Sequence, residues 1–179
     1  MQSISPEIIF RGNDAWGRAI PHISKLIQSP LILGRSIHTQ HLRDELLRDL
    51  KNQNLNVNSD NLHFDCCYED ISRIKSIILE NNNDAVIAAG GGKVLDSGKY
   101  LAESLDIPCI TVPLSASTCA GWTALSNIYT KNGQFIKDVP LRSCPKVLVY
   151  DHKFIQTAPS RTLASGIADA LAKWYESSI

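Results

Sequence analysis

The alternation of short apolar runs with segments of helical spacing is the feature that most constrains how this chain can fold. Four apolar runs have the length of buried strands: 30–34, 84–89, 108–112 and 146–151. Between them lie segments in which apolar residues recur every three or four positions, as on one helix face: 38–53, 68–83 and 92–105. Strands that alternate with helices are joined by crossovers, so neighbouring strands run parallel. The sequence therefore predicts an α/β fold, a mostly parallel sheet with helices on both faces.

Other stretches are less regular. Residues 62–65 are a candidate for a short strand. Residues 114–145 are rich in Ser, Thr, Gly and Asn, and short strands at 127–130 and 134–138 are predicted around a Lys-Asn-Gly turn signal. A long irregular insertion in an α/β domain is more often functional than idle. The last periodic segment, 159–177, predicts a helix with its apolar residues near one face.

Composition excludes several classes of protein. A length of 179 residues suits a domain with a hydrophobic core, and 18 basic against 18 acidic residues leave no basic excess for nucleic acid. No apolar run approaches the roughly 20 residues of a membrane helix, and no secretory signal is visible. The five cysteines form no CxxC pair, which argues against a disulfide framework or a zinc knuckle. We therefore expect a cytoplasmic protein with reduced cysteines and no nucleic-acid or membrane partner.

Three consecutive glycines, Gly90 to Gly92, join the apolar run 84–89 to the helical segment 92–105, and Lys93 follows them. Glycines at a strand-to-helix turn let the backbone approach a ligand closely, and the helix start favours negative charge there. A phosphate or pyrophosphate fits such a turn. However, neither GxGxxG nor the P-loop pattern GxxxxGK[ST] is present. From the pattern alone, phosphate binding and a plain tight turn both stay open.

Three stretches together resemble one family: "AAGGGKVLDSGKYLA" (88–102), "PCITVPLSASTCAGWTALSNIYTKNGQF" (108–135) and "APSRTLASGIADALAKWYES" (158–177). They are similar to the glycerol dehydrogenases of the metal-dependent, iron-containing alcohol dehydrogenase superfamily. The resemblance implies a Rossmann-like cofactor domain followed by a helical metal-binding domain. On that basis we expect residues 1–157 to be the nucleotide-binding domain and 158–179 to begin the helical domain, the rest of which this chain lacks.

The resemblance also implies the residues that bind a nicotinamide cofactor. Those that match the family's cofactor-binding positions are Gly91, Gly92, Lys93, Ser117, Thr118, Thr123, Leu125 and Tyr129. The family's substrate-facing aspartate is replaced here by Cys119, the residue expected at the catalytic, substrate-facing position. A thiol is a poor substitute for a carboxylate that accepts hydrogen bonds from a polyol. The substrate class expected from the resemblance is a small alcohol or polyol, with glycerol itself less favoured.

Arg35 and Ser36 follow the strand 30–34, where glycerol dehydrogenases have an aspartate. An acid at this turn accepts hydrogen bonds from the ribose and repels a 2′-phosphate, whereas arginine can pair with that phosphate. The turn therefore favours NADP over NAD as cofactor. NAD binding, with Arg35 as an ordinary solvated loop residue, stays open.

Asp169 matches the aspartate with which the family binds zinc or iron, in a site that the resemblance completes with two histidines. The histidines of this chain all precede Asp169, and none has ligand spacing: His22, His38, His41, His63 and His152. A catalytic zinc needs about three protein ligands. We therefore expect an incomplete metal site in this chain.

The function that these observations favour is a metal-assisted, NAD(P)-dependent alcohol or polyol dehydrogenase, with this chain inactive by itself. Two alternatives stay open. One is a nucleotide-binding module without catalysis, and the other is a lyase similar to dehydroquinate synthase, which shares the fold. A homo-oligomer in which the last helix packs on a second copy is also open.

Overall fold

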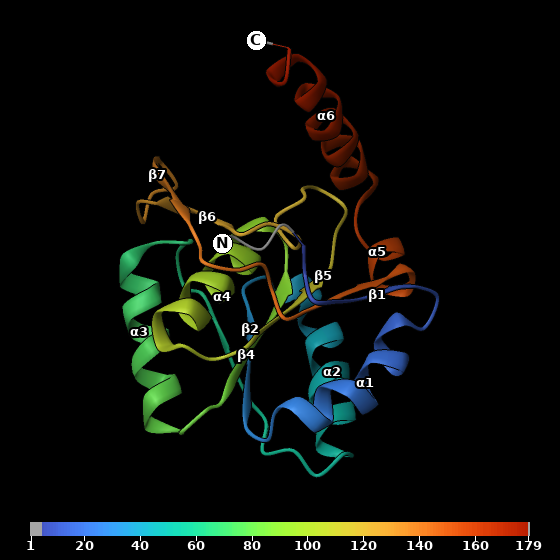
Figure 1. Ribbon diagram of the computed structural model, residues 1–179, viewed down its shortest axis with the longest axis vertical. Helices are drawn as coiled ribbons and strands as arrows, with labels where there is room; N and C mark the ends of the chain where they lie inside the picture. Colours follow the sequence, from blue (N-terminus) through green and yellow to red (C-terminus); the bar gives the residue numbers. More distant parts are fainter. Residues whose placement is uncertain (1–4, 179) are drawn as a thin grey trace.

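The computed structural model describes residues 5–178. Over these residues six parallel strands form one sheet in the order β1-β8-β5-β4-β2-β3. Their bounds are Ile8–Gly12 (β1), Pro30–Gly34 (β2), Asn58–Asn61 (β3), Ala85–Gly90 (β4), Cys109–Pro113 (β5) and Val147–Asp151 (β8). The predicted α/β fold with a parallel sheet is confirmed (Figure 1).

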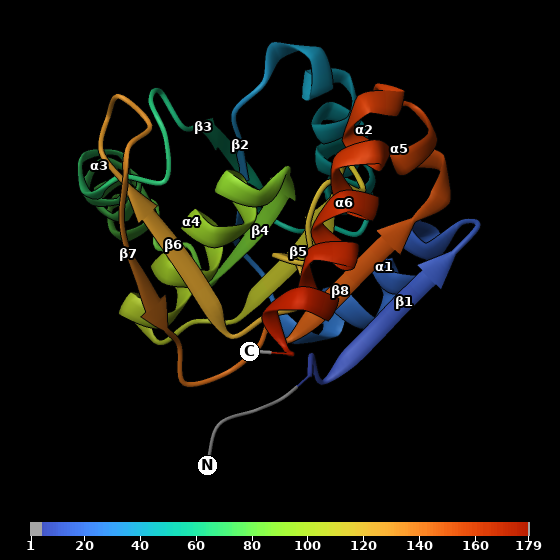
Figure 2. The ribbon, with the colours of Figure 1, turned by 90° about the horizontal axis from the view of Figure 1, so that it is seen from above.

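Helices α1 and α2 cover one face of this sheet and α3 and α4 the other, as predicted, whereas α6 projects away from it (Figure 1; Figure 2 gives a second view). Their bounds are Ala15–Leu26 (α1), Gln40–Lys51 (α2), Tyr68–Glu80 (α3), Gly92–Leu105 (α4), His152–Gln156 (α5) and Ser160–Glu176 (α6). A short 3₁₀ turn, Ile37–Thr39, precedes α2. No helix within residues 5–178 is long and apolar enough to cross a membrane.

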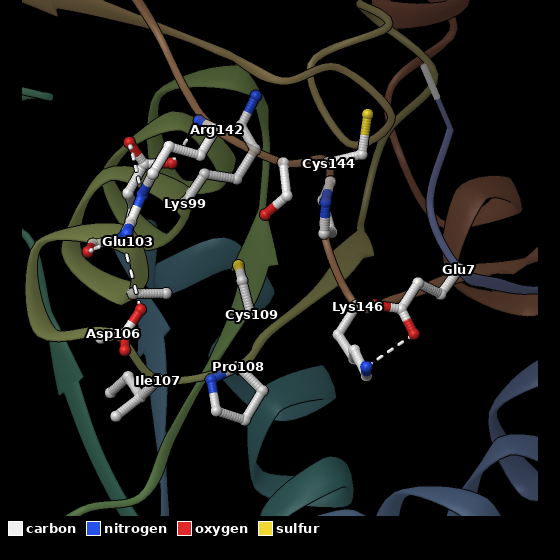
Figure 3. A pocket seen from close by; sticks show the side chains of 13 residues that line it. Glu7, Lys99, Glu103, Asp106, Ile107, Pro108, Cys109, Arg142, Cys144 and Lys146 are labelled. Carbon is white, nitrogen blue, oxygen red and sulfur yellow. Dashed lines mark hydrogen bonds and ion pairs between the residues drawn. The ribbon is translucent and has the colours of Figure 1, made fainter. Parts of the chain in front are cut away.

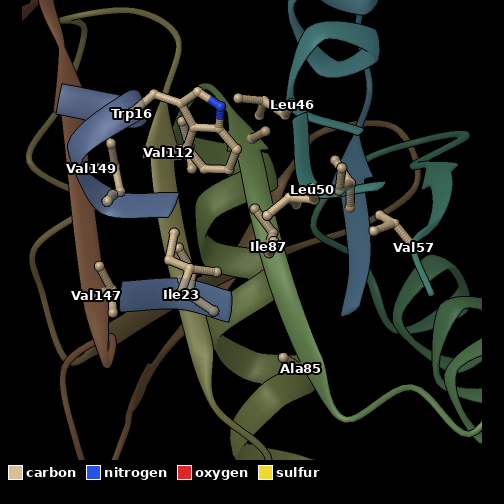
Figure 4. Close-up of a cluster of buried hydrophobic side chains, with 14 of the residues drawn as sticks. Trp16, Ile23, Leu46, Leu50, Val57, Ala85, Ile87, Val112, Val147 and Val149 are labelled. Atoms are coloured by element: carbon tan, nitrogen blue, oxygen red, sulfur yellow. The ribbon is translucent and has the colours of Figure 1, made fainter. Parts of the chain in front are cut away.

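Side chains that alternate along the strands divide the core between the two faces. Ile32 and Ile87 point toward α1 and α2, whereas their neighbours Leu31 and Val86 point toward α3 and α4. Figure 4 shows the first of these clusters, where Trp16 and Ile23 of α1 lie against the sheet. Because the four central strands β2, β4, β5 and β8 are buried on both faces, they are continuously apolar in sequence, which is why the sequence predicts them.

The structure differs from the sequence prediction at the amino terminus and around residue 62. The predicted strand 62–65 is wrong, because the strand is the polar segment Asn58–Asn61 at the edge of the sheet, and 62–65 is loop. β1, α1 and α5 were not predicted. The insertion 114–145 contains the predicted hairpin, β6 (Leu125–Tyr129) paired antiparallel with β7 (Phe135–Pro140). Gly133, with φ of +79°, closes the turn between them.

Gly98 allows α4 to lie directly on β4. A Cβ atom at Gly98 would come 2.4 Å from the Cβ of Ala88, which the strand holds in place. We expect Gly98→Ala to lower the free energy of unfolding by about 1–2 kcal/mol, because overpacking of about 1–3 kcal/mol exceeds the roughly 1 kcal/mol gained in helix propensity. The measurement is urea unfolding followed by circular dichroism.

Gly17→Ala in α1 is the matched control. There the added Cβ would meet the end of the Asp14 side chain, which can rotate away. We expect this variant to be as stable as the parent or slightly more so, because alanine favours a helix over glycine. Equal effects of the two substitutions would contradict close packing of α4 on β4.

Candidate functional site

A cavity of about 680 Å³ opens at the carboxyl ends of β2 and β4. The chain runs from β2 outward to β3, then crosses to β4 on the other side of β2. In open parallel sheets, ligands bind outside the carboxyl ends of the strands where the strand order reverses in this way. The cavity is lined by the loop after β2, the turn after β4, residues 114–115 after β5, residues 157–159 after α5, and residues 161–162 in the first turn of α6. Its position is therefore that of a ligand site in this class of fold.

The glycine turn forms one wall of the cavity. Gly91 is the amino-terminal cap of α4, with φ of −85° and ψ of −176°, and a Cβ there would find its nearest neighbour, Ser115 Oγ, 3.8 Å away. Gly92 lies closer to the following loop, since a Cβ there would be 3.0 Å from Thr118 Cγ2. The first amide groups of a helix have no intrahelical acceptor and attract anions. The turn thus presents amides to the cavity where the approach is open.

The ionisable side chains that line the cavity are all basic residues. Those that line it are Arg35, His38, His41, Lys93 and Arg161, and no Asp or Glu side chain is among the described lining residues. The two histidines are exposed, and the sequence did not indicate that they lie at this site. Arg161, near the start of α6, was also missed, since nothing in its local sequence connects it to the glycine turn. The lining matches a ligand with several negative charges.

The buried side chain of Arg43, on α2, holds the loop that contains Arg35 and Ser36. The guanidinium of Arg43 donates to the Ser36 carbonyl oxygen at 2.9 Å and to Thr39 Oγ1 at 2.6 Å. It occupies the space above Gly34 where any other residue would have a Cβ. Burial lowers the pKa of Arg43. This arginine adds a fixed positive charge behind the loop, and its role was not visible in the sequence.

Lys93 lines the cavity, but its ammonium group already has partners on the hairpin side. It forms an ion pair with Asp65, which is buried, and lies 4.8 Å from the centre of the Tyr129 ring. Lys93 and Tyr129, both predicted to contact the cofactor, are therefore brought together. Asp65 was missed, because it precedes α3 and is 28 positions away from Lys93 in sequence.

The remaining predicted cofactor residues lie along the loop between β5 and β6. Ser117 Oγ is 3.2 Å from Ser115 Oγ, and Thr118 Oγ1 accepts a hydrogen bond from the Ala120 amide at 3.2 Å. Thr123 and Leu125 are held by the ammonium group of Lys99 on α4. None of Ser117, Thr118, Thr123 and Leu125 is among the residues that line the 680 Å³ cavity.

A neighbouring cavity of about 510 Å³ brings Cys119 and Asp169 together. Its lining also includes Thr118, and α6 closes it from one side. The approach of α6 depends on Gly166, because a Cβ there would lie 1.8 Å from the carbonyl oxygen of Ala116. The structure thus places the predicted substrate-facing residue and the predicted metal ligand at one site.

The donor groups at Asp169 do not by themselves fit a metal ion. Its carboxylate lies 3.9 Å from Lys173 Nζ, and no group of three His, Cys, Asp or Glu side chains suited to a metal occurs within residues 5–178. A transition metal needs about three protein ligands in a catalytic site. Within the described residues, Asp169 therefore supplies one carboxylate of the roughly three ligands that such a site needs.

A smaller cavity, of about 290 Å³, lies at the opposite end of the strands, beside the start of β5 (Figure 3). Its charged groups neutralise one another: Arg142 lies 3.4 Å from Asp106, and Lys146 lies 2.6 Å from Glu7. Cys109 also lines it, and burial raises the pKa of this thiol to about 12. This cavity therefore offers neither net charge nor a reactive thiol for a ligand.

Comparisons with known proteins agree with the fold. The sequence profile described as iron-containing alcohol dehydrogenase matches residues 6–152. An uncharacterized oxidoreductase of Synechocystis is 38% identical over 178 residues, which cover 99% of this chain and 46% of that protein. The glycerol dehydrogenase of Escherichia coli is 33% identical over 172 residues, which cover 96% of this chain and 47% of that protein.

Solved structures of glycerol dehydrogenases share the fold of this chain. The glycerol dehydrogenase of Schizosaccharomyces pombe has a TM-score of 0.87 at 28% identity, covering 98% of this chain and 44% of that one. The chain spans about half the length of the curated relatives it matches. Because the profile matches most of its residues, the chain belongs to the iron-containing alcohol dehydrogenase family.

Proposed function

We propose that this chain is the cofactor-binding half of an NAD(P)-dependent alcohol or polyol dehydrogenase. The observation that carries the proposal is the 680 Å³ cavity at the point where the strand order reverses, with the glycine turn as one wall. A dinucleotide would place its pyrophosphate on the amides of Gly91 and Gly92. Residues 1–157 would form the nucleotide-binding domain, and 158–179 would begin the helical domain.

The charge of the cavity supports NADP(H) over NAD(H). Arg35 lies where an acidic residue would select NAD, and Arg43 adds charge behind the same loop. A guanidinium can pair bidentately with the 2′-phosphate, and Ser36 can donate a hydrogen bond to it. Arg161 lines the same cavity and would contact the phosphates of the dinucleotide.

The substrate class rests on the relatives and on the position of Cys119. Several of the relatives are named glycerol dehydrogenase, and one is named hydroxycarboxylate dehydrogenase A. In such a reaction the alcohol becomes a carbonyl, and the nicotinamide supplies the hydride acceptor. Cys119 and Thr118 would bound the substrate in the 510 Å³ cavity. With a thiol in place of a carboxylate, the proposed substrate is a small alcohol less dependent on hydrogen bonds than glycerol.

Substitution of Arg35 tests the cofactor assignment. We expect Arg35→Ala to weaken NADPH binding by about 10- to 100-fold, since a charge-assisted hydrogen bond contributes about 1.5–3 kcal/mol. NADH binding should change by less than about threefold, because NADH has no 2′-phosphate. Titration calorimetry with each reduced cofactor, at two salt concentrations, measures both affinities.

Arg48→Ala is the matched control, because Arg48 is exposed on α2 and does not line the cavity. It should leave both affinities unchanged. If Arg35→Ala weakened NADH and NADPH equally, the 2′-phosphate would not be bound at Arg35. If the parent protein bound neither cofactor, the proposed dinucleotide site would be wrong.

A further inference from the structure

Helix α4 contains a buried ion pair that the proposed function does not use. Asp96 is 7% exposed and Lys99 is 3% exposed, and Lys99 Nζ lies 2.9 Å from Asp96 Oδ1. The sequence gives Asp96 no more than a favourable place near the start of a helix. Charged residues are almost never fully buried unless they are paired, so the position of this pair calls for a structural reason.

Lys99 donates hydrogen bonds to the loop that leads into β6. Its ammonium group donates to the carbonyl oxygen of Thr123 at 3.1 Å, to Thr123 Oγ1 at 3.2 Å, and to the carbonyl oxygen of Leu125. An ammonium group has three N–H donors, so with Asp96 these acceptors account for all of them. Lys99 therefore fixes the backbone at two positions that the family resemblance assigns to cofactor contacts.

Asp96 holds the same segment by other atoms. Its second carboxylate oxygen accepts a hydrogen bond from the Asn127 amide at 3.4 Å, and its own carbonyl oxygen accepts one from Ser126 Oγ at 3.0 Å. Together the pair anchors residues 123–127 to the side of α4. The amino end of the same helix, one to two turns away, carries Gly91 and Gly92.

We infer that Lys99 and Asp96 are positioning residues for the cofactor site, which set the segment 123–127 at a fixed place relative to the glycine turn. The inference rests on the proposed function, since it assumes that both parts contact one dinucleotide. A rigid helix joins them, so the pair, together with the Ser126 hydrogen bond to the Asp96 carbonyl oxygen, sets the spacing between the phosphate-binding turn and the β6 entry. Neither residue touches the cofactor cavity through its charged group.

Lys99→Met tests this role by removing the ammonium group while keeping most of the side-chain volume. Burial raises the pKa of Asp96 and Lys99 opposes that shift, so Asp96 left alone would tend to be protonated. The double variant Asp96→Asn with Lys99→Met leaves no buried charge without a partner and serves where the single variant does not fold. Lys51→Met, at an exposed lysine at the end of α2, is the matched control.

Affinity is measured for NADPH and for adenosine 2′,5′-bisphosphate, a fragment that would contact the Arg35 loop but not residues 123–127. We expect the single or double variant to weaken NADPH binding at least about tenfold and fragment binding by less than about twofold. Lys99→Arg, which keeps the charge, should recover part of the NADPH affinity. A general loss of structure would weaken the binding of both ligands, and Lys99→Arg would not restore it.

Hydrogen exchange gives a readout that needs no cofactor. The amides of residues 125–127 should exchange at least about tenfold faster in the variant, whereas those in the middle of α4 should be unchanged. Unchanged exchange at 125–127, or equal losses for NADPH and the fragment, would overturn the positioning role. If the parent protein bound neither ligand but the exchange result held, the proposed function would be wrong, and a positioning role for the cofactor with it.

Discussion

Replacing Gly91 with valine is expected to abolish dinucleotide binding while leaving the protein folded. At this position φ is −85° and ψ is −176°, an extended conformation that valine adopts readily. The nearest atom to an added Cβ is Ser115 Oγ at 3.8 Å, an ordinary contact distance. An added Cβ therefore fits in the folded protein, and the space around it is the cavity through which a phosphate would approach.

The expected loss of affinity is large because several interactions disappear together. The pyrophosphate could no longer reach the amides at the start of α4, and each charge-assisted hydrogen bond is worth about 1.5–3 kcal/mol. Loss of two of them corresponds to a factor of at least about 100 in the dissociation constant. No change of this size is expected in the free energy of unfolding.

Calorimetric titration with NADPH and thermal unfolding, carried out on the same preparation, separate the two effects. Ala172→Val provides the control, since it adds the same side chain at an exposed position of α6. If Gly91→Val still bound NADPH with an affinity within tenfold of the parent, the turn would not hold the pyrophosphate. A lower melting temperature together with lost binding would instead point to a structural role for Gly91.

The centre of the sheet could be predicted from sequence because local patterns determine it. The run 84–89 is continuously apolar, the glycines follow it at once, and the helix 92–105 repeats at the correct spacing. The edges could not be predicted in this way. β1 is only half-buried, α1 carries Pro21 inside it, and β3 consists of Asn, Ser and Asp. An edge strand is held by hydrogen bonds to one neighbouring strand, so its sequence does not need the continuous apolar run by which a central strand is predicted.

The residues that hold the site in place were less predictable than the residues that line it. The glycine turn is visible as a motif, but Asp65, Arg43 and Lys99 act through contacts between distant segments. Lys99 reaches Thr123, 24 positions away, and Lys93 reaches Asp65, 28 positions away. A polar residue with such a partner looks in sequence like any surface residue. Only the fold shows that it is buried.

Asp151 is such a residue, and its replacement by alanine is expected to cause the largest loss of stability. It lies at the end of β8, is 2% exposed, and accepts backbone hydrogen bonds from two different helices. Its Oδ2 accepts from the Trp16 amide in the first turn of α1 at 2.9 Å, and its Oδ1 accepts from Lys153 in α5 at 2.8 Å. One carboxylate thus stabilises the positive ends of both helices.

Asp151→Ala would leave the buried Trp16 amide without this acceptor and would remove the cap of α5. An unsatisfied buried donor costs about 1–3 kcal/mol, and loss of a helix cap costs about 1 kcal/mol more. We expect a total of about 2–4 kcal/mol, or a melting temperature lower by roughly 10 °C for a chain of this size. Because α5 leads directly into residues 157–159 of the cavity lining, NADPH affinity should also decrease.

Asp84→Ala is the matched control for this effect. The Asp84 carboxylate also accepts two backbone hydrogen bonds, from Gln28 at 2.6 Å and from Ser29 at 2.9 Å, but it is only partly buried. Water can replace the carboxylate there, so we expect a loss of about 1 kcal/mol. Urea unfolding of both variants measures the difference. Because burial is what separates the two sites, equal losses would mean that Asp151 acts as an ordinary surface cap and does not tie α1 and α5 to the end of β8.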